Sequence, residues 1–315
     1  PAAPCPAHRA KTLPERNLHP KTDPTANPER NPHPKQSLNL NRNQKPDPHR
    51  KHNRNQKRNR NNSLFHSLLS TPYFLLLTPY FKMKKPLLVI STGAGISAES
   101  GISTFRDAGG LWENHPVMEV ASATGFRKNP ALIHRFYNER RRQLLDAQPN
   151  AAHRALVDLE KDYDVHVITQ NVDDLHERAG SKNVLHLHGE LMKIRSIAHP
   201  EYTETLDSGR LETTPGTRGR NGDLMRPHIV FFEEAVPNIE PAIELVRRAD
   251  VFVVIGTSLV VYPAAGLLQF VRPGTPVYYI DPHPAATHGS PAVRVIAKKA
   301  TEGVADLARL LAEQA

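Results

Sequence analysis

The stretch "VISTGAGISAESGISTFRDAGGLW" runs from Val89 to Trp112 and decides the fold class. It opens as an apolar strand, turns on Gly93 and Gly95, and continues into a helix start. Backbone N–H groups at such a turn favour a bound phosphate. The spacing is not G-x-G-x-x-G, however, and two glycines alone could simply make a strand-to-helix turn.

The apolar runs that follow alternate with helical patterns. Helical periodicity covers segments such as 151–161, 240–248 and 264–271. The strand-like runs span residues 86–92, 164–170, 183–189, 228–232, 250–258 and 276–281. Such alternation predicts an α/β fold, a Rossmann-like doubly wound parallel sheet. We expect a smaller inserted module near residues 110–148 and 192–224.

Positive charge is confined to the N-terminal part of the chain. Residues 1–82 carry 15 Lys/Arg and 4 Asp/Glu, whereas residues 83–315 carry 26 and 28. The domain therefore has no basic footprint for nucleic acid. The tail is rich in Asn, Arg, Pro and His, which predicts a disordered arm or translated upstream sequence ahead of Met83. A basic arm that binds nucleic acid or an anionic membrane is the alternative.

Two features argue against a membrane anchor or a thiolate site. The apolar run 63–81 is broken by Pro72 and Pro79 and starts too deep for a signal sequence. Cys5, the single cysteine, lies in the tail. The domain 83–315 therefore has no disulfide and no thiolate metal site.

Polar residues directly follow four of the apolar runs. They are Gly93-Ala94-Gly95, Gln170-Asn171, His188-Gly189 and Gly256-Thr257-Ser258. Ligands of doubly wound sheets bind at the carboxyl ends of the strands. The four segments are therefore expected to converge on one binding rim.

Each polar motif also has a structural interpretation. Asn171, Asp173 and His176 could cap a helix. His188 could be a buried structural histidine. His186, His188 and Glu190 in "HLHGE" could form a metal triad, which would make the protein a metal hydrolase.

Four motifs in order resemble the sirtuins, NAD-dependent protein-lysine deacylases. They are "GAGISAESGISTFRDAGGLW", "TQNVDDLHERAG", "LHGEL" and "GTSLVVYPAAGL", and the resemblance covers essentially residues 83–315. It implies His188 as catalytic base and Asn171 as a second catalytic residue. The implied NAD-contacting residues are Gly93, Ala94, Gly95, Ala98, Phe105, Arg106, Gln170, Asn171, Asp173, Gly256, Thr257, Ser258, Asp281 and Ala300.

The chemistry that the resemblance implies suits these residue types. The acyl-lysine oxygen attacks the ribose as nicotinamide leaves, and a neutral histidine then takes a ribose hydroxyl proton. The implied products are free lysine, nicotinamide and O-acyl-ADP-ribose. A sirtuin-like ADP-ribosyltransferase is the main alternative. A Rossmann dehydrogenase lacks its glycine fingerprint.

The helix expected after Asn129-Pro130 bears on the acyl group. Its apolar stripe contains Leu132, Ile133, Phe136, Tyr137 and Leu144. Arg140 falls at the centre of that stripe, where it needs an anion, which could be a structural carboxylate. Tyr137 and Arg140 also resemble the pair of the sirtuin branch that removes succinyl and malonyl groups, and Ala121 matches its pocket-widening small residue.

The chain departs from the common sirtuin pattern at three places. The segment 191–227 has no cysteine, so we expect no zinc and no other metal. Glu233 stands where many members have Gly, and Asp281 replaces a common Asn. We further expect acyl-lysine proteins as substrates, no nucleic acid or membrane partner, a monomer, and a cytoplasmic location.

Overall fold

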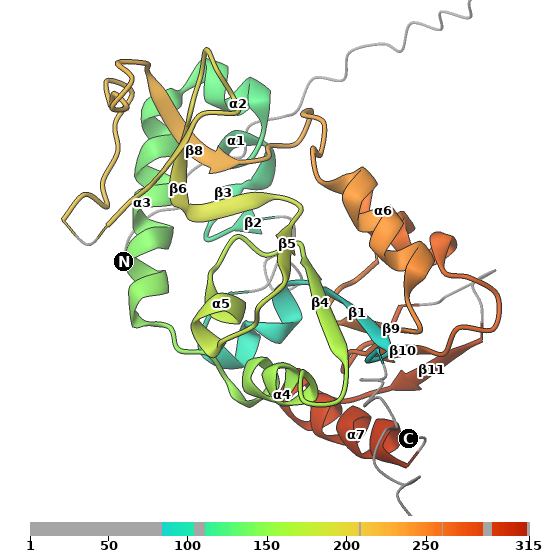
Figure 1. Ribbon diagram of the computed structural model, residues 1–315. Helices are drawn as coiled ribbons and strands as arrows, with labels where there is room; N and C mark the ends of the chain where they lie inside the picture. Colours follow the sequence, from blue (N-terminus) through green and yellow to red (C-terminus); the bar gives the residue numbers. More distant parts are fainter. Residues whose placement is uncertain (1–83, 104–110, 208, 260, 286–291, 314–315) are drawn as a thin grey trace, which may run out of the picture. The chain divides into compact units, whose positions relative to one another are not determined.

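The computed structural model describes residues 84–103, 111–207, 209–259, 261–285 and 292–313 (Figure 1). They belong to the second of two compact units, Phe74–Ala315. The expected tail, residues 1–82, lies outside the described residues, so both its disorder and the boundary at Met83 stay predictions.

A six-stranded sheet forms the centre of this unit. Every neighbouring pair is parallel, in the order β11-β10-β9-β1-β4-β5. The strands are β1 (Leu87–Thr92), β4 (Asp164–Thr169), β5 (Val184–His186), β9 (Val251–Ile255), β10 (Val277–Ile280) and β11 (Val293–Ile296). The α/β class expected from the sequence is confirmed.

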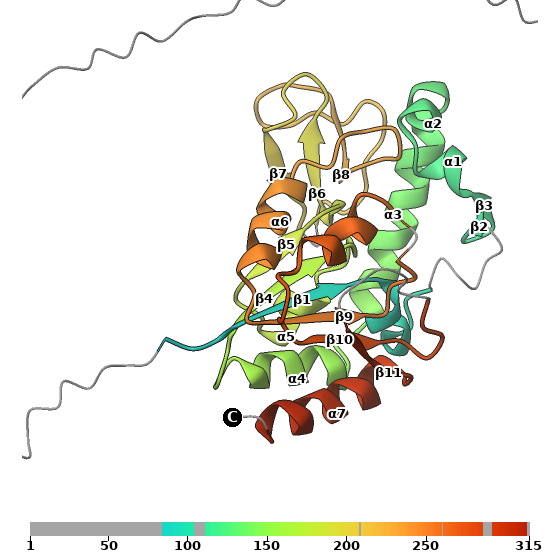
Figure 2. The same cartoon turned by 90° about the vertical axis from the view of Figure 1, so that its right-hand side faces the viewer.

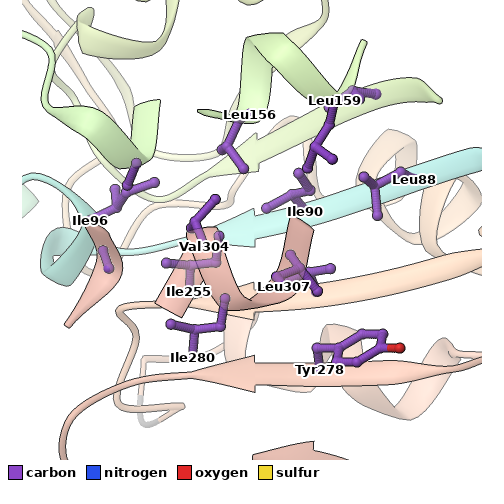
Figure 3. Close-up of a cluster of buried hydrophobic side chains, with 14 of the residues drawn as sticks. Leu88, Ile90, Ile96, Leu156, Leu159, Ile255, Tyr278, Ile280, Val304 and Leu307 are labelled. Atoms are coloured by element: carbon purple, nitrogen blue, oxygen red, sulfur yellow. The ribbon is translucent and has the colours of Figure 1, made fainter. Parts of the chain in front are cut away.

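Alternate residues of β1 serve two apolar layers. Leu88 and Ile90 pack in a cluster with α4 (Ala151–Leu159) and α7 (Ala300–Ala312), drawn in Figure 3. Leu87 and Val89 point to the opposite layer, with α6 (Ile239–Arg248) and the 3₁₀ helix η3 (Ala264–Phe270). Figure 2 shows α4 and α7 below the sheet and α6 above it. Helices on both faces explain why β1 is apolar from Leu87 to Ile90.

The strand order reverses at β1. The chain passes from β1 to β4 and β5 on one side, then returns to build β9, β10 and β11 on the other. This reversal lies at the carboxyl end of β1, the place where doubly wound folds bind their ligands.

A smaller module lies beyond those strand ends (Figure 1). Its helical part comprises the hairpin β2 (Leu111–Trp112) and β3 (His115–Pro116), then α1 (Val117–Val120), α2 (Ala123–Lys128) and α3 (Pro130–Asp146). Its sheet has the order β7-β6-β8, from β6 (Gly189–Ser196), β7 (Thr203–Thr205) and β8 (Met225–Ile229).

One expected strand belongs to a different sheet from the one predicted. Residues 228–232 were grouped with the parallel strands, but β8 pairs antiparallel with β6 in the separate sheet. An apolar run carries no information about its partner strand, which explains the error. The start of α3 is as expected, since the Asn129 Oδ1 accepts the Leu132 N–H at 3.0 Å and Pro130 occupies the first turn.

Packing and carboxylate contacts hold the small sheet. Ile194, Leu206 and Met225 form its buried core. The carboxylate of Asp223 accepts hydrogen bonds from Ser196 at 2.5 Å and from Asn221 at 2.8 Å. Within the described part of the chain, no helix is both long and apolar enough to cross a membrane.

Candidate active site

Two glycine loops pack back to back at the end of β1. The Gly93 N–H donates to the Ile255 carbonyl at 3.0 Å, and the Gly95 N–H donates to the Gly256 carbonyl at 2.8 Å. A Cβ on Gly95 would lie 2.5 Å from the Gly256 Cα, and Gly256 has φ +62. Both loops therefore need glycine, because any side chain would force them apart.

The amides of Gln170 and Asn171 tie the next strand end to these loops. The Asn171 Nδ2 donates to the Gly93 carbonyl and to Ser97 Oγ, each at 3.2 Å. The Gln170 Nε2 donates to Thr257 Oγ1 at 3.3 Å. The segments expected to converge on one rim are thus joined by hydrogen bonds.

Asp173 lies beneath this rim and is 5% exposed. Its carboxylate accepts hydrogen bonds from Ser97 Oγ at 3.0 Å and from the Leu175 N–H at 3.2 Å. Burial raises the pKa of Asp173. The sequence interpretation missed Ser97, which links Asn171 to Asp173. Its only signal was its position inside the glycine turn.

His188 follows β5 and begins the connection to β6. Its Nδ1 lies 3.0 Å from the Gln170 carbonyl. A carbonyl can only accept, so Nδ1 carries the proton and the lone pair is on Nε2. Burial lowers the pKa of His188, which keeps the ring neutral at pH 7. The geometry gives His188 the tautomer and charge of a general base.

His186 is committed to other partners. Its Nδ1 lies 3.1 Å from the Asn171 carbonyl and its Nε2 lies 2.8 Å from Glu177 Oε1. Both ring nitrogens are therefore used as donors, and neither offers a lone pair to a metal. Glu190 instead accepts from Lys193 at 2.8 Å. The metal-triad hypothesis was wrong, and the described residues contain no group of three His, Cys, Asp or Glu able to hold a metal ion.

His176 does not cap a helix, as one interpretation had it. It is fully buried, and its Nε2 lies 3.1 Å from Thr92 Oγ1. The helix that contains it, α5 (Leu175–Ala179), has Asp174 at its N-cap without a side-chain capping bond. His176 thus supports the end of β1 from below the rim.

Tyr137 and Arg140 are buried on one face of α3, as the stripe predicted. Among the described residues, Tyr137 Oη and Arg140 Nε and Nη1 are buried without a hydrogen-bond partner. The Arg140 guanidinium lies over the Phe136 ring at 4.9 Å. The nearest carboxylates in the described ranges are Glu113 at 3.7 Å and Glu139 at 3.9 Å, too far for hydrogen bonds. A protein carboxylate therefore compensates the charge without filling these donors.

Ala121 and Glu233 lie on two backbone segments that are joined by a hydrogen bond. Ala121 is 6% exposed, and its carbonyl accepts the Phe232 N–H at 2.8 Å. Glu233 keeps a left-handed conformation at φ +75, and its carboxylate accepts the Thr124 N–H at 2.9 Å. The departure from Gly thus preserves the backbone conformation that a glycine would adopt.

The other described residues expected to contact the cofactor lie at strand ends and at the starts of helices. Asp281 is buried at the end of β10 and accepts the His283 N–H at 2.8 Å. Ala300 is buried at the start of α7. Ala94, Ala98 and Ser258 follow the ends of β1 and β9, with Ala94 and Ala98 in the 3₁₀ turns η1 (Ala94–Ile96) and η2 (Ala98–Ser100). Phe105 and Arg106 lie outside the described residues.

This arrangement fits a dinucleotide. The strand order reverses at this rim, glycine backbone from two loops packs closely there, and the segment Gln170-Asn171 lies beside the neutral imidazole of His188. Amides and a neutral imidazole can bind and deprotonate sugar hydroxyls without a strong charge of their own.

Comparisons with known proteins agree with this geometry. The family model described as Sir2 family matches residues 93–263. The chain is 55% identical over 227 residues to an NAD-dependent protein deacylase of Bacteroides thetaiotaomicron, covering 71% of this chain and 97% of that protein. A Helicobacter pylori NAD-dependent protein deacylase is 50% identical over 228 residues, covering 72% and 98%. A solved complex of a Sir2 homolog with NAD matches with TM-score 0.65 and 38% identity, covering 73% of this chain and 91% of that chain. The chain belongs to the Sir2 family.

Proposed function

We propose that this Sir2-family enzyme, an NAD-dependent protein deacylase, prefers lysine acyl groups that end in a carboxylate, such as succinyl and malonyl. The observation that carries the proposal is the set of unfilled donors on α3. Tyr137 Oη and Arg140 Nε and Nη1 are buried and find no hydrogen-bond partner in the part of the chain that the structure describes.

Buried donors without a hydrogen bond cost free energy, and a bound carboxylate would remove that cost by accepting their hydrogen bonds. An unsatisfied buried polar group costs about 1–3 kcal/mol, and more when it is charged. A guanidinium binds a carboxylate through two parallel hydrogen bonds, and burial keeps Tyr137 protonated by raising its pKa. An acetyl group has no oxygen beyond its carbonyl to fill these donors, whereas a succinyl group has two.

We assign the reaction to the residues of the rim. NAD supplies the electrophilic ribose carbon and the acceptor of the acyl group. Asn171 and Gln170 orient the sugar and the nicotinamide amide, and buried Asp173 fixes Asn171 through Ser97. His188 takes a proton from a ribose hydroxyl at Nε2, the nitrogen left free by its bond to Gln170. A base placed at that proton favours deacylation over ADP-ribosyl transfer to protein.

The test is an acyl panel with one peptide carrying acetyl, malonyl, succinyl or glutaryl lysine. Arg140→Met should lower kcat/KM on succinyl-lysine tens- to thousands-fold, because losing one member of a buried charge pair costs about 2–5 kcal/mol. Deacetylation should stay unchanged or improve modestly. Tyr137→Phe should act in the same direction but more weakly, by about 0.5–1.5 kcal/mol.

Arg142→Met is the matched control. Arg142 lies on the same helix but is half exposed and pairs with Glu212. Its removal should leave the acyl preference unchanged. If Arg140→Met lowers both activities together and also lowers the melting temperature, Arg140 is structural and the acidic-acyl proposal is wrong.

We extend the proposal to the enzyme's setting. Its substrates would be acylated proteins, it would act as a monomer, and it would work in the cytoplasm, where a dinucleotide cosubstrate is available. Sedimentation of the purified chain tests whether it is a monomer, and fractionation of cells tests its location. A dimer at micromolar concentration would contradict the first.

A further inference from the structure

We propose that Glu113 is the resident counter-ion of Arg140 and sets the balance between neutral and acidic acyl groups. This inference rests on the proposed function, because it requires that Arg140 meets the acyl group. It adds a residue to which neither the sequence motifs nor the site assignment gave a role.

Glu113 is held in place by aromatic packing on both sides. It sits at the tip of the hairpin β2–β3, between Trp112 and His115. The Trp112 ring lies 4.8 Å from the Phe136 ring, and the His115 ring lies 5.7 Å from the same ring. Phe136 also carries the Arg140 guanidinium at 4.9 Å. One ring therefore fixes both the hairpin and the arginine.

The backbone at Glu113 is unfavourable for its residue type. Glu113 has φ +49 and Asn114 has φ +65, as in a two-residue hairpin turn with both central residues left-handed. Asn and Gly suit such positions, whereas Glu does not. A glutamate at the first position is consistent with a role for its side chain that outweighs the local strain.

That side chain faces Arg140. Glu113 Oε2 lies 3.7 Å from Arg140 Nη1, and the two side chains are 24% and 10% exposed. Burial lowers the pKa of Arg140, and the nearby charges of Glu113 and Glu139 oppose this shift. Glu139 is the more solvent-facing of the two acids, with its side chain 52% exposed and 3.9 Å from Nη2. The charge of Glu113 is therefore less screened by solvent than that of Glu139, and it compensates the charge of Arg140 more strongly.

The distance gives Glu113 two opposite effects on substrates. It balances the charge of Arg140 when the acyl group is neutral, so that acetyl-lysine does not leave a buried cation without a counter-charge. It leaves Nε and Nη1 without a hydrogen bond to any described residue, so a substrate carboxylate can still bind, but that carboxylate meets the like charge of Glu113. Glu113 therefore widens the acyl range at the expense of the acidic preference.

The test compares Glu113→Gln with Glu139→Gln, each losing one carboxylate beside Arg140. Glu113→Gln should raise kcat/KM for succinyl-lysine and lower it for acetyl-lysine, each about 3- to 5-fold, as expected for one partly screened charge. The ratio of the two should therefore shift about 9- to 25-fold. Glu139→Gln should shift it less than 2-fold, because its more exposed charge is better screened. An unchanged ratio in Glu113→Gln, or an equal shift in both variants, would overturn the inference.

Two further variants separate the causes. Glu113→Gly removes both the charge and the strain, so it should shift the ratio as Glu113→Gln does and raise the melting temperature. If it leaves the ratio unchanged, charge is not the cause and the inference fails. In the Arg140→Met background, Glu113→Gln should no longer lower the activity on acetyl-lysine, because no buried cation is left to compensate, so the ratio should change less than in the native enzyme.

The inference and the proposed function fail in different ways. If Arg140→Met abolishes the succinyl preference but Glu113→Gln leaves the ratio unchanged, only the role of Glu113 is refuted. If Arg140→Met leaves the ratio unchanged, the acidic-acyl function is refuted, and the role of Glu113 with it.

Discussion

The pair His186 and Glu177 gives the sharpest prediction about catalysis. The Asn171 carbonyl and the Glu177 carboxylate both lie at hydrogen-bond distance from the His186 ring, which must then carry two protons. Burial alone would lower the pKa of His186, but the hydrogen bond and charge of Glu177 prevail and raise it. The charged His186 ring donates a hydrogen bond to the Asn171 carbonyl and so holds the backbone of that residue. Glu177→Gln should therefore disturb catalysis by making the His186 ring easier to deprotonate.

The size of the effect follows from the exposure of the pair. A hydrogen bond to a charged group contributes about 1.5–3 kcal/mol net. The Glu177 side chain is 41% exposed, so solvent screening reduces this to about 1 kcal/mol. That corresponds to about a 5-fold loss of kcat at pH values where the native ring is charged and the variant ring is neutral. In Glu177→Gln the pKa of His186 falls, and the ring becomes neutral at a lower pH than in the native enzyme.

The assay is kcat between pH 6 and 9 for the native enzyme and for Glu177→Gln. The two should differ most between the lowered pKa of His186 in the variant and its raised pKa in the native enzyme, and they should converge at higher pH, where both rings are neutral. The pair also stabilises the fold most below pH 6.5, and this contribution is lost as pH rises through the raised pKa. Glu190→Gln is the control, because Glu190 pairs with Lys193 and acts on His186 only at a distance. An equal loss at every pH would show that Glu177 acts by packing alone and would refute the reasoning.

Four other predictions follow from the structure. His188→Tyr should abolish deacylation while circular dichroism shows a folded protein; full activity would remove His188 from the mechanism. Glu233→Gly should melt at a higher temperature than Glu233→Ala, because both lose the bond to Thr124 but only glycine tolerates φ +75 freely. Elemental analysis should find well under one zinc per chain, and a strong chelator should leave activity intact. Unfolding free energy measured in urea should fall as pH drops from 6.5 towards 4, by about 3 kcal/mol for each of His134 and His153, because burial holds both neutral with pKa values of about 4.

The parts of the fold that follow local periodicity were predictable. β1 and β4 stand where the apolar runs put them, and α3 begins at its Asn129 cap. β11 was not predicted, because "VRVI" is a short edge strand whose two central residues are exposed. β8 was predicted with the wrong partner, since pairing depends on residues far away in the sequence.

The candidate site also has a part that was predictable from the sequence and a part that was not. The convergence of Gly93, Asn171, His188 and Gly256 follows from the topology of a doubly wound sheet. Long-range contacts were not predictable, because they join segments that only the tertiary structure brings together. Ser97 reaches Asp173 across 76 residues, and Arg140 meets Glu113 on a hairpin whose turn carries no usual signal.

The small module shows how a sheet without thiolate ligands can still be anchored. Arg141 of α3 is fully buried, and it donates to the Leu191 carbonyl at 2.8 Å and to Asn138 Oδ1 at 2.7 Å. Asn138 in turn bonds the backbone of Thr213 at 2.9 and 3.0 Å. These bonds connect α3 to β6 and to the loop before β8, the two arms that the module must hold together. Because α3 also carries Tyr137 and Arg140, the contacts that anchor the cysteine-free module also fix the helix that would read the acyl group.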